Sequence, residues 1–291
     1  MFKNVLVGVD GRANGRDAIA LATRLNDANG KLTLAYVHRG EAKEDLEDAH
    51  KLLEAEREAA GVQAELLSVV SASPGRGLHQ QAEELGADLL VVGSCSRGAL
   101  GRVMLGDDTR AALNGAPCPV AIASRGLADR PEPIANVGVG YNGSPESEAA
   151  LALARELAVP TRASVHALEV VSIPSVAYAG LIPPAIGETI DVLLQEAKVR
   201  LRDLPGVEGD AVYGLAGEEL AAFGDQLDLM LVGSRGYGPV KRLVLGSTSD
   251  YLERHARCSL LVLTRGAGDQ AAAGDVSGEQ QLEAAGAAGK V

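Results

Sequence analysis

Residues Val232–Ser249 read VGSRGYGPVKRLVLGSTS, and the rest of the chain can be interpreted outward from this stretch. The apolar run Leu229–Val232 leads directly into Gly233–Gly236, nine residues follow, and Gly246–Ser249 opens a polar stretch with a helical pattern. Glycines let the backbone approach a bulky ligand, and the unpaired N–H groups at a helix start favour an anion. The three hydroxyls after Gly246 can cap the helix or bind phosphate oxygens. The pattern favours an anion site, and the alternative is a tight connection without a ligand.

The same organisation occurs twice in the chain, whose 291 residues suggest about two domains. ADLLVVGSCSRGALGRVMLGDDT recurs as LDLMLVGSRGYGPVKRLVLGSTS, and NVLVGVDGRANGRDAIALATRL recurs as NVGVGYNGSPESEAALALARELA. Equivalent residues are 132 positions apart early (Asp10 and Asn142) and 140 apart late (Gly93 and Gly233). The second copy therefore carries about eight extra residues, which we place in its SIPSVAYAGLIPP stretch.

Within each copy, short apolar runs alternate with amphipathic stretches at helical spacing. The first copy has five predicted strands: Val5–Val9, Leu32–Val37, Ala64–Val70, Leu89–Val92 and Val120–Ala123. Aromatic residues make up only 3% of the chain, so Val, Leu, Ile and Ala must form a core suited to parallel strands covered on both faces. Strands separated by helices imply right-handed crossovers. The sequence predicts an α/β fold of two doubly wound parallel five-stranded sheets, Rossmann-like and in tandem.

The spacing of Gly233, Gly236 and Gly246-Ser247 resembles the ATP-binding motif of the universal stress protein family, and the repeat extends the resemblance over nearly all of residues 1–265. The resemblance implies a fold like that of the adenine nucleotide alpha-hydrolases. It places a first domain at 1–125, a linker at 126–133 and a nucleotide-binding domain at 134–265. Residues 266–291 are mostly Ala, Gly, Asp, Glu and Gln, which predicts a disordered tail. In this family the fifth strands commonly pair domains, which implies an intramolecular pseudo-dimer.

The resemblance also implies a cofactor, ATP or else ADP or AMP, with or without Mg²⁺. The implied binding residues follow the strands and open the last helix of the second copy: Gly140, Asn142, Val170, Val232, Gly233, Gly236, Gly246, Ser247, Thr248 and Ser249. ATP-binding members carry an Asp near the adenosine where this chain has Asp10 in the first copy and Asn142 in the second. An Asn side chain still donates and accepts hydrogen bonds.

The first copy departs further from the motif. It reads Gly93, two residues, Ser96, nine residues and then Gly106-Asp107. A carboxylate about 4 Å from a phosphate costs on the order of 4 kcal/mol at an effective dielectric near 20. An Asp also suits an unoccupied helix N-terminus. We therefore predict a degenerate, non-binding first domain.

Other functions find less support in the sequence. Gly138–Gly143 fits the GxGxxG of dinucleotide-binding folds, but Gly138 falls inside a predicted strand and the first copy breaks the pattern. The chain has no GxxxxGK[ST] and no GxSxG, and its five histidines show no metal spacing. No residue is a convincing general base, so we favour a non-enzymatic protein. Slow ATP hydrolysis and a ligand-free interaction module remain alternatives.

The composition and net charge of the chain limit the classes of partner that it can bind. The net charge of −12 argues against nucleic acid, and no apolar run reaches the roughly 20 residues of a membrane span. The N-terminus enters a predicted strand at once, which favours a cytoplasmic protein. The three cysteines form no CxxC, and Cys118 and Cys258 occupy equivalent places ahead of apolar runs. We expect a nucleotide-responsive stress or regulatory protein, and the sequence leaves open whether two chains associate.

Overall fold

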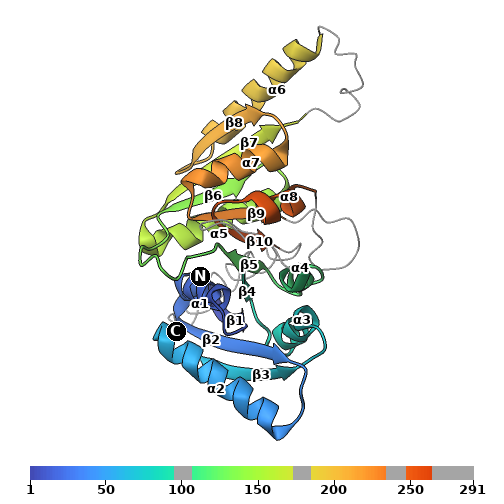
Figure 1. The fold of residues 1–291 in the computed structure, drawn as a ribbon. Coiled ribbons are helices and arrows are strands. Elements are labelled where there is room, and N and C mark those ends of the chain that lie inside the picture. The colour runs from blue at the N-terminus through green and yellow to red at the C-terminus, as the bar shows by residue number, and fades with distance from the viewer. Residues whose placement is uncertain (95–106, 173–184, 234–246, 264–291) are drawn as a thin grey trace, which may run out of the picture.

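The computed structural model describes residues 1–94, 107–172, 185–233 and 247–263, and Figure 1 shows strands and helices alternating through both halves. The first half consists of β1 (Phe2–Val9), α1 (Ala13–Leu25), β2 (Asn26–His38), α2 (Lys43–Ala60), β3 (Glu65–Val70), α3 (Pro74–Leu85), β4 (Leu89–Gly93), α4 (Asp107–Leu113) and β5 (Val120–Ala123). The second half consists of β6 (Asn136–Gly140), α5 (Pro145–Thr161), β7 (Ser164–Val171), α6 (Ala185–Arg202), β8 (Glu208–Tyr213), α7 (Ala216–Phe223), a 3-10 turn (Gly224–Gln226), β9 (Leu229–Gly233), α8 (Ser247–His255) and β10 (Ser259–Leu263).

The strands form one ten-stranded sheet in the order β3-β2-β1-β4-β5-β10-β9-β6-β7-β8. Each half contributes five parallel strands in the doubly wound order. Both halves use the same register: Val5 pairs with Leu32 and Leu89, and Val137 pairs with Val165 and Leu229. The predicted α/β fold class is confirmed.

Helices cover both faces because the strands are apolar on both sides. One cluster of buried residues joins the strands to α1, α2, α5 and α6, and a second joins them to α3, α4, α7 and α8. Each cluster runs through both halves, so the two copies share a continuous core on either face of the sheet. Its largest fully buried side chains are mostly leucines, as the low aromatic content requires.

The seam between the halves is antiparallel. Leu261 of β10 pairs with Ala121 of β5, which confirms the predicted pairing of the fifth strands. The Ser124 N–H donates to the Ser259 Oγ at 3.2 Å beside the seam, and Arg110 and Asp250 form an ion pair of 3.1 Å between α4 and α8. The intramolecular pseudo-dimer is therefore held by main-chain, hydroxyl and ionic contacts.

Two carboxylates hold the connection between β5 and β6. The buried Asp17 of α1 accepts hydrogen bonds from the N–H groups of Gly126 and Ala128, each at 2.8 Å. Asp228 accepts from the N–H groups of Ala135 and Asn136, at 2.8 and 2.9 Å. The linker is thus fixed at both ends by side chains from the domains it joins.

The main difference from the expected elements lies in β2, which begins at Asn26 rather than Leu32 because Asn26 pairs with Phe2 of β1. Gly138 lies inside β6, as expected. A Cβ there would overlap Leu227 Cδ1 and approach Phe223 Cε1 to 2.9 Å, so this glycine allows α7 and the turn after it to pack against the sheet. The predicted tail (266–291) lies wholly outside the described residues. The SIPSVAYAGLIPP insertion does too, except for its first residue, Ser172. In the part of the chain that is described, no helix is both long and apolar enough to span a bilayer.

Candidate functional site

The candidate site lies where the strand order reverses in the second half. The neighbouring parallel strands β6 and β9 end there, at Gly140 and Gly233. β6 is followed by α5 on one face of the sheet, whereas β9 precedes α8 on the other. Chains leaving in opposite directions open a crevice at this edge, which is where ligands of doubly wound sheets bind.

The structure brings the predicted strand-end residues to this edge. A Cβ on Gly140 would lie 3.4 Å from Val232 Cγ1 and 3.3 Å from Leu220, so Gly140 and Val232 are immediate neighbours. Val170 lies on β7, next to β6, one residue before the strand ends. These residues come from three adjacent strands.

Gly233 is required by packing. A Cβ there would lie 2.7 Å from the Glu146 Cβ and 3.3 Å from the Glu146 backbone in the first turn of α5. Gly93 is placed in the same way, because a Cβ there would overlap the carbonyl oxygen of Asn14 in α1. Both glycines therefore permit the close approach of a strand end to a helix start, whatever ligand contact they also allow.

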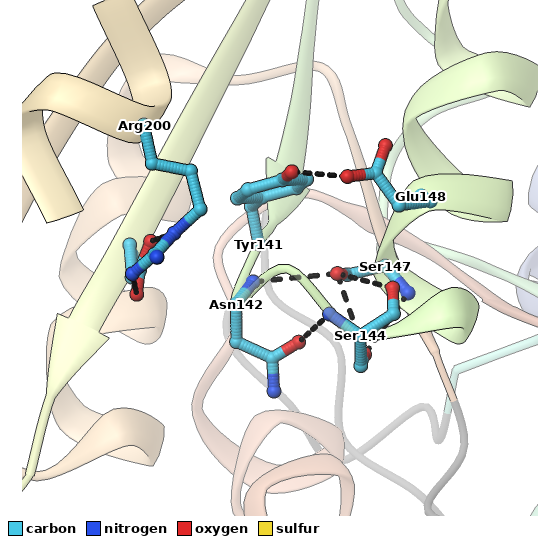
Figure 2. Close-up of polar contacts among 7 residues, drawn as sticks. Tyr141, Asn142, Ser144, Ser147, Glu148 and Arg200 are labelled. Atoms are coloured by element: carbon cyan, nitrogen blue, oxygen red, sulfur yellow. Dashed lines mark hydrogen bonds and ion pairs between the residues drawn. The ribbon is translucent and has the colours of Figure 1, made fainter.

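The turn between β6 and α5 is built by Asn142. Its Oδ1 accepts a hydrogen bond from the Ser144 N–H at 3.1 Å, and Gly143 adopts φ +71° (Figure 2). Asp10 makes the same turn in the first half by accepting from the Arg12 N–H at 3.1 Å, with Gly11 at φ +72°. An amide oxygen replaces a carboxylate oxygen without loss of the bond, so the Asn substitution preserves the backbone conformation.

Two serines fix the start of α5. The Ser147 N–H donates to the Ser144 Oγ at 3.3 Å, and the Ser147 Oγ donates to the Ser144 carbonyl at 2.9 Å. The Asn142 N–H points to the Ser147 Oγ at 3.4 Å (Figure 2). The turn holds the Asn142 amide in place. Because Asn142 is exposed, this amide is also accessible at the edge of the crevice.

The predicted hydroxyls of α8 have different exposures. Ser247 begins the helix and is exposed, Thr248 is half-buried, and Ser249 is only 4% exposed. Ser247 and Thr248 are therefore the reachable pair at this helix start. Gly236 and Gly246, together with the basic Arg235, Lys241 and Arg242 of the intervening segment, lie outside the described residues.

Sequence analysis missed a polar cluster beside this edge. The hydroxyl of Tyr141 donates to Glu148, and Arg200 binds Glu169 through Nε and Nη2 at 3.1 and 2.8 Å (Figure 2). Tyr141 and Glu169 are 4% and 8% exposed. Comparing the repeats would have revealed the cluster, because Tyr141 stands where the first half has Val9.

Burial raises the pKa of Tyr141 to about 12, and the hydrogen bond to Glu148 and the negative charge of Glu148 act in the same direction. The hydrogen bond and charge of Glu169 raise the pKa of Arg200. Tyr141 is consequently a neutral hydrogen-bond donor and Arg200 a permanent cation at neutral pH. The Tyr141–Glu148 bond fixes α5 against the end of β6, and the Arg200–Glu169 pair fixes α6 against the neighbouring strand β7.

The two described cysteines and the acidic and histidine side chains offer no further chemistry here. Cys118 and Cys258 are free and buried, and burial raises the pKa of each thiol to about 12, so both are protonated packing residues. Among the described ranges, no three His, Cys, Asp or Glu side chains gather to hold a metal ion.

Comparisons with known proteins agree with this architecture. Universal stress protein Rv2005c of Mycobacterium tuberculosis is 33% identical over 187 residues, which are 60% of this chain and 61% of that relative. A universal stress protein of Thermus aquaticus is 30% identical over 136 residues, 42% of this chain and 98% of the relative. A crystal structure of a universal stress protein from Archaeoglobus fulgidus shares the fold with a TM-score of 0.63 at 20% identity, covering 90% of this chain and 98% of that one.

This chain therefore matches about three fifths of the length of the mycobacterial relative. The profile of the universal stress protein family matches two separate stretches, residues 1–124 and 133–264. These two matches take up most of the chain and coincide with the two halves of the ten-stranded sheet. The chain therefore belongs to the universal stress protein family, with two family domains in tandem.

Proposed function

We propose that the second half binds an adenine nucleotide, ATP or else ADP or AMP, at the carboxyl ends of β6 and β9, and that the protein responds to this nucleotide in a stress or regulatory role. The observation that carries the proposal is that the Asn142 turn and the strand ends at Gly140 and Gly233 lie at one edge of the sheet, and that α8, the helix that follows β9, begins with the exposed Ser247. Gly233 and Ser247 are the two ends of the Gly-x2-Gly-x9-Gly-Ser motif, and the Asn142 turn lies on the neighbouring strand connection.

Each element has a separate task in this proposal. The main chain near Val170 meets the adenine edge, and the exposed Asn142 amide lies near the adenosine. The N–H groups and hydroxyls of Ser247 and Thr248 receive the phosphates, because a helix start concentrates unpaired donors and partial positive charge. Gly236 and Gly246 allow the intervening backbone to approach them. Mg²⁺ would enter with the phosphates, as it does in many nucleotide sites.

The first half does not bind nucleotide in this proposal. Its motif has Ser96 for Gly236 and Asp107 for Ser247, so a side chain and a negative charge act against the same phosphates. The role that fits is structural: the first half supplies the partner sheet through β5. The proposal places the protein in the cytoplasm, which the two free buried thiols favour.

The test is calorimetric titration of the full chain with ATP, ADP and AMP, preceded by mass spectrometry of the natively purified protein after denaturation. We expect one nucleotide per chain. Ser247→Ala should weaken ATP binding by about 10- to 150-fold, the equivalent of one hydrogen bond to a charged acceptor worth about 1.5–3 kcal/mol. Gly236→Val should abolish binding while the circular dichroism spectrum is retained.

A matched control is Ser144→Ala, which removes a cap from α5, on the other face of the sheet from α8. It should lower stability by about 1 kcal/mol and leave the stoichiometry unchanged. If no nucleotide co-purifies and none of the three binds the folded chain, the ligand-free interaction module is the better description. Release of phosphate from bound ATP would instead support the slow ATPase.

A further inference from the structure

The turn between β6 and α5 has an arginine packed over it. Gly143 follows Asn142 in this turn, and a Cβ on Gly143 would lie 3.5 Å from Arg200 Cδ and 3.7 Å from Arg200 Nε. Figure 2 shows Arg200 reaching from α6 past Tyr141 toward the turn. We call the surface formed by Asn142, Gly143 and Arg200 the turn surface. It lies at the carboxyl end of β6, at the edge of the crevice.

Asn142 presents hydrogen-bond donors at this surface. Its Oδ1 accepts from the Ser144 N–H at 3.1 Å, and because an N–H needs an acceptor, the orientation of the amide is fixed. The Nδ2 group points away from Ser144 (Figure 2), and no acceptor among the described residues binds it. An amide nitrogen carries two N–H donors and no acceptor. The accessible end of Asn142 therefore suits a ligand atom that accepts hydrogen bonds.

Arg200 adds a positive charge with donors still available. Its Nε and Nη2 hold Glu169 at 3.1 and 2.8 Å, which uses two of the five N–H groups of the guanidinium. Glu169 is 8% exposed, whereas the Arg200 side chain is 44% exposed. A ligand at the turn surface therefore meets the cation of this ion pair and not its carboxylate. The bond to Glu169 also fixes the guanidinium before any ligand arrives.

The first half differs at both positions. Asp10 occupies the place of Asn142 and brings a carboxylate to the turn. Leu52 of α2 occupies the place of Arg200, because a Cβ on Gly11 would lie 2.8 Å from Leu52 Cδ1. An acidic and an apolar side chain thus stand where the second half has an amide and a guanidinium. Both differences make the turn of the second half the better site for an anion.

We propose that the turn surface binds a phosphate carried by the ribose, so that the preferred ligand is an adenosine phosphorylated at its 5′ position and also at its 2′ or 3′ position. This inference rests on the proposed function. With adenine near Val170 and the 5′-phosphate at the start of α8, the ribose lies over the end of β6. Its O2′ and O3′ are the substituents left to meet the turn surface. A phosphate there accepts charge-assisted hydrogen bonds from Arg200 and Asn142, which a neutral hydroxyl does not match.

The acidic side chains near the turn do not oppose this phosphate strongly. Glu148 accepts from the Tyr141 hydroxyl, and Figure 2 shows it on the opposite side of that ring from the guanidinium. Glu146 packs against Gly233 of β9, whereas the guanidinium binds β7, and β6 lies between these two strands. Glu196, one turn earlier on α6, is exposed, so solvent and salt screen its charge.

Calorimetric titration of the full chain with three ligands tests the inference: 5′-AMP, adenosine 2′,5′-bisphosphate and adenosine 3′,5′-bisphosphate. One of the two bisphosphates should bind about tenfold or more tightly than 5′-AMP, as one hydrogen bond to a charged group can provide. The bisphosphate that shows the gain identifies the ribose oxygen that carries the phosphate. The gain should shrink at high salt, because the guanidinium is partly exposed.

Variants locate the second phosphate, and the measured quantity is the ratio of bisphosphate to 5′-AMP affinity. Asn142→Asp, which introduces the residue of the first half, should bring this ratio down to about one, because the carboxylate would face the phosphate. Arg200→Leu combined with Glu169→Gln should do the same, and the second change avoids an unpaired buried carboxylate. Arg257→Leu is the matched control. It removes an arginine of similar exposure, 50%, that binds Asp225 ahead of β10, at the amino edge of the sheet, and should leave the ratio unchanged.

Three results would overturn the inference, and they separate it from the proposed function. If 5′-AMP binds and both bisphosphates bind no more tightly, the inference fails and the proposed function stands. If none of the three ligands binds the folded chain, both fail. If a bisphosphate binds more tightly but both variants retain the gain, the second phosphate lies elsewhere and the turn surface is not its site.

Discussion

The two halves of the chain have the same backbone at the point where the sheet order reverses, but they surround it with different side chains. Asp10 and Asn142 make the same turn, and Gly93 and Gly233 admit the same helix start. What repeats is therefore what the fold needs. Aspartate and asparagine are interchangeable there because the turn uses only a side-chain oxygen.

The differences begin one residue before the turn. Val9, in the first half, pairs in register with Tyr36. The corresponding residues of the second half are Tyr141 and Glu169, because Gly140 pairs with Leu168. The aromatic ring thus moves from the second strand to the first, and a buried carboxylate takes its former place.

The ion pairs that tie the neighbouring helices to this point also differ. In the first half Arg16 of α1 reaches Glu56 of α2, at 3.5 Å. In the second half the position of Arg16 is taken by Glu148, which accepts from Tyr141, while Arg200 of α6 binds the strand residue Glu169. The comparison teaches that the repeated fold tolerates two different polar arrangements at one site, so the side chains specific to the second half are the ones to test for function.

The largest effect should come from breaking the feature that the halves share. Gly93→Ala should lower the free energy of unfolding by about 3 kcal/mol or more, and Gly233→Ala by about 1–3 kcal/mol, because each methyl group is forced into a helix start. Urea denaturation measures both. Gly61→Ala is the control: Gly61 has φ +63° and no neighbour within 4 Å of a Cβ, so it should cost only the left-handed strain of about 1–2 kcal/mol. Equal losses at all three positions would mean that the close packing is not responsible.

The next largest effect should be stabilisation by a nucleotide that binds only one of the two halves. ATP at a hundredfold excess over its dissociation constant should stabilise the full chain by about 2.7 kcal/mol, through the second half alone. The double change Ser96→Gly with Asp107→Ser should add a second site in calorimetric titration. Two equivalent sites in the unmodified chain would contradict the proposed difference between the halves.

Tyr141 should give a smaller effect that depends on pH. Its pKa is raised to about 12, above the value of about 10 expected in the unfolded chain, so folding favours the neutral phenol. This contribution is present below pH 10 and is lost as the pH rises from about 10 to 12. The free energy of unfolding of the unmodified chain should therefore fall by about 2 kcal/mol over that range. The Tyr141→Phe chain should show no such fall. Parallel pH profiles of the two chains would show that the phenol is not held neutral by folding.

The smallest effect should be at the turn itself. Asn142→Asp makes the second half identical to the first at this position and should change stability by less than about 0.5 kcal/mol. Asn142→Ala removes the hydrogen bond to Ser144 and should cost about 1 kcal/mol. Thermal unfolding of the two variants at low and high salt checks the pair, and a large loss in the Asp variant would mean that charge at the turn matters more than the hydrogen bond.

The sequence by itself determined the repeat, the order of strands and helices and the fold class, whereas the pairing of the fifth strands was expected only from the resemblance to the universal stress protein family. These features are local or periodic: apolar runs of strand length, helical spacing between them, and a glycine-bearing connection after Val232 appear in the order of the chain. The strand-end residues of the candidate site were predictable for the same reason, because parallel strands bring their carboxyl ends to one edge.

Only the tertiary structure decided what these residues contact. That Gly233 packs on Glu146, that Asp17 holds the linker, and that Ser249 is buried while Ser247 is exposed depend on elements far apart in sequence. The cluster of Tyr141 with Glu148, and of Glu169 with Arg200, likewise joins a strand end, a second strand and two helices. Burial and hydrogen bonding depend on how separate surfaces meet, and a linear pattern does not contain that information.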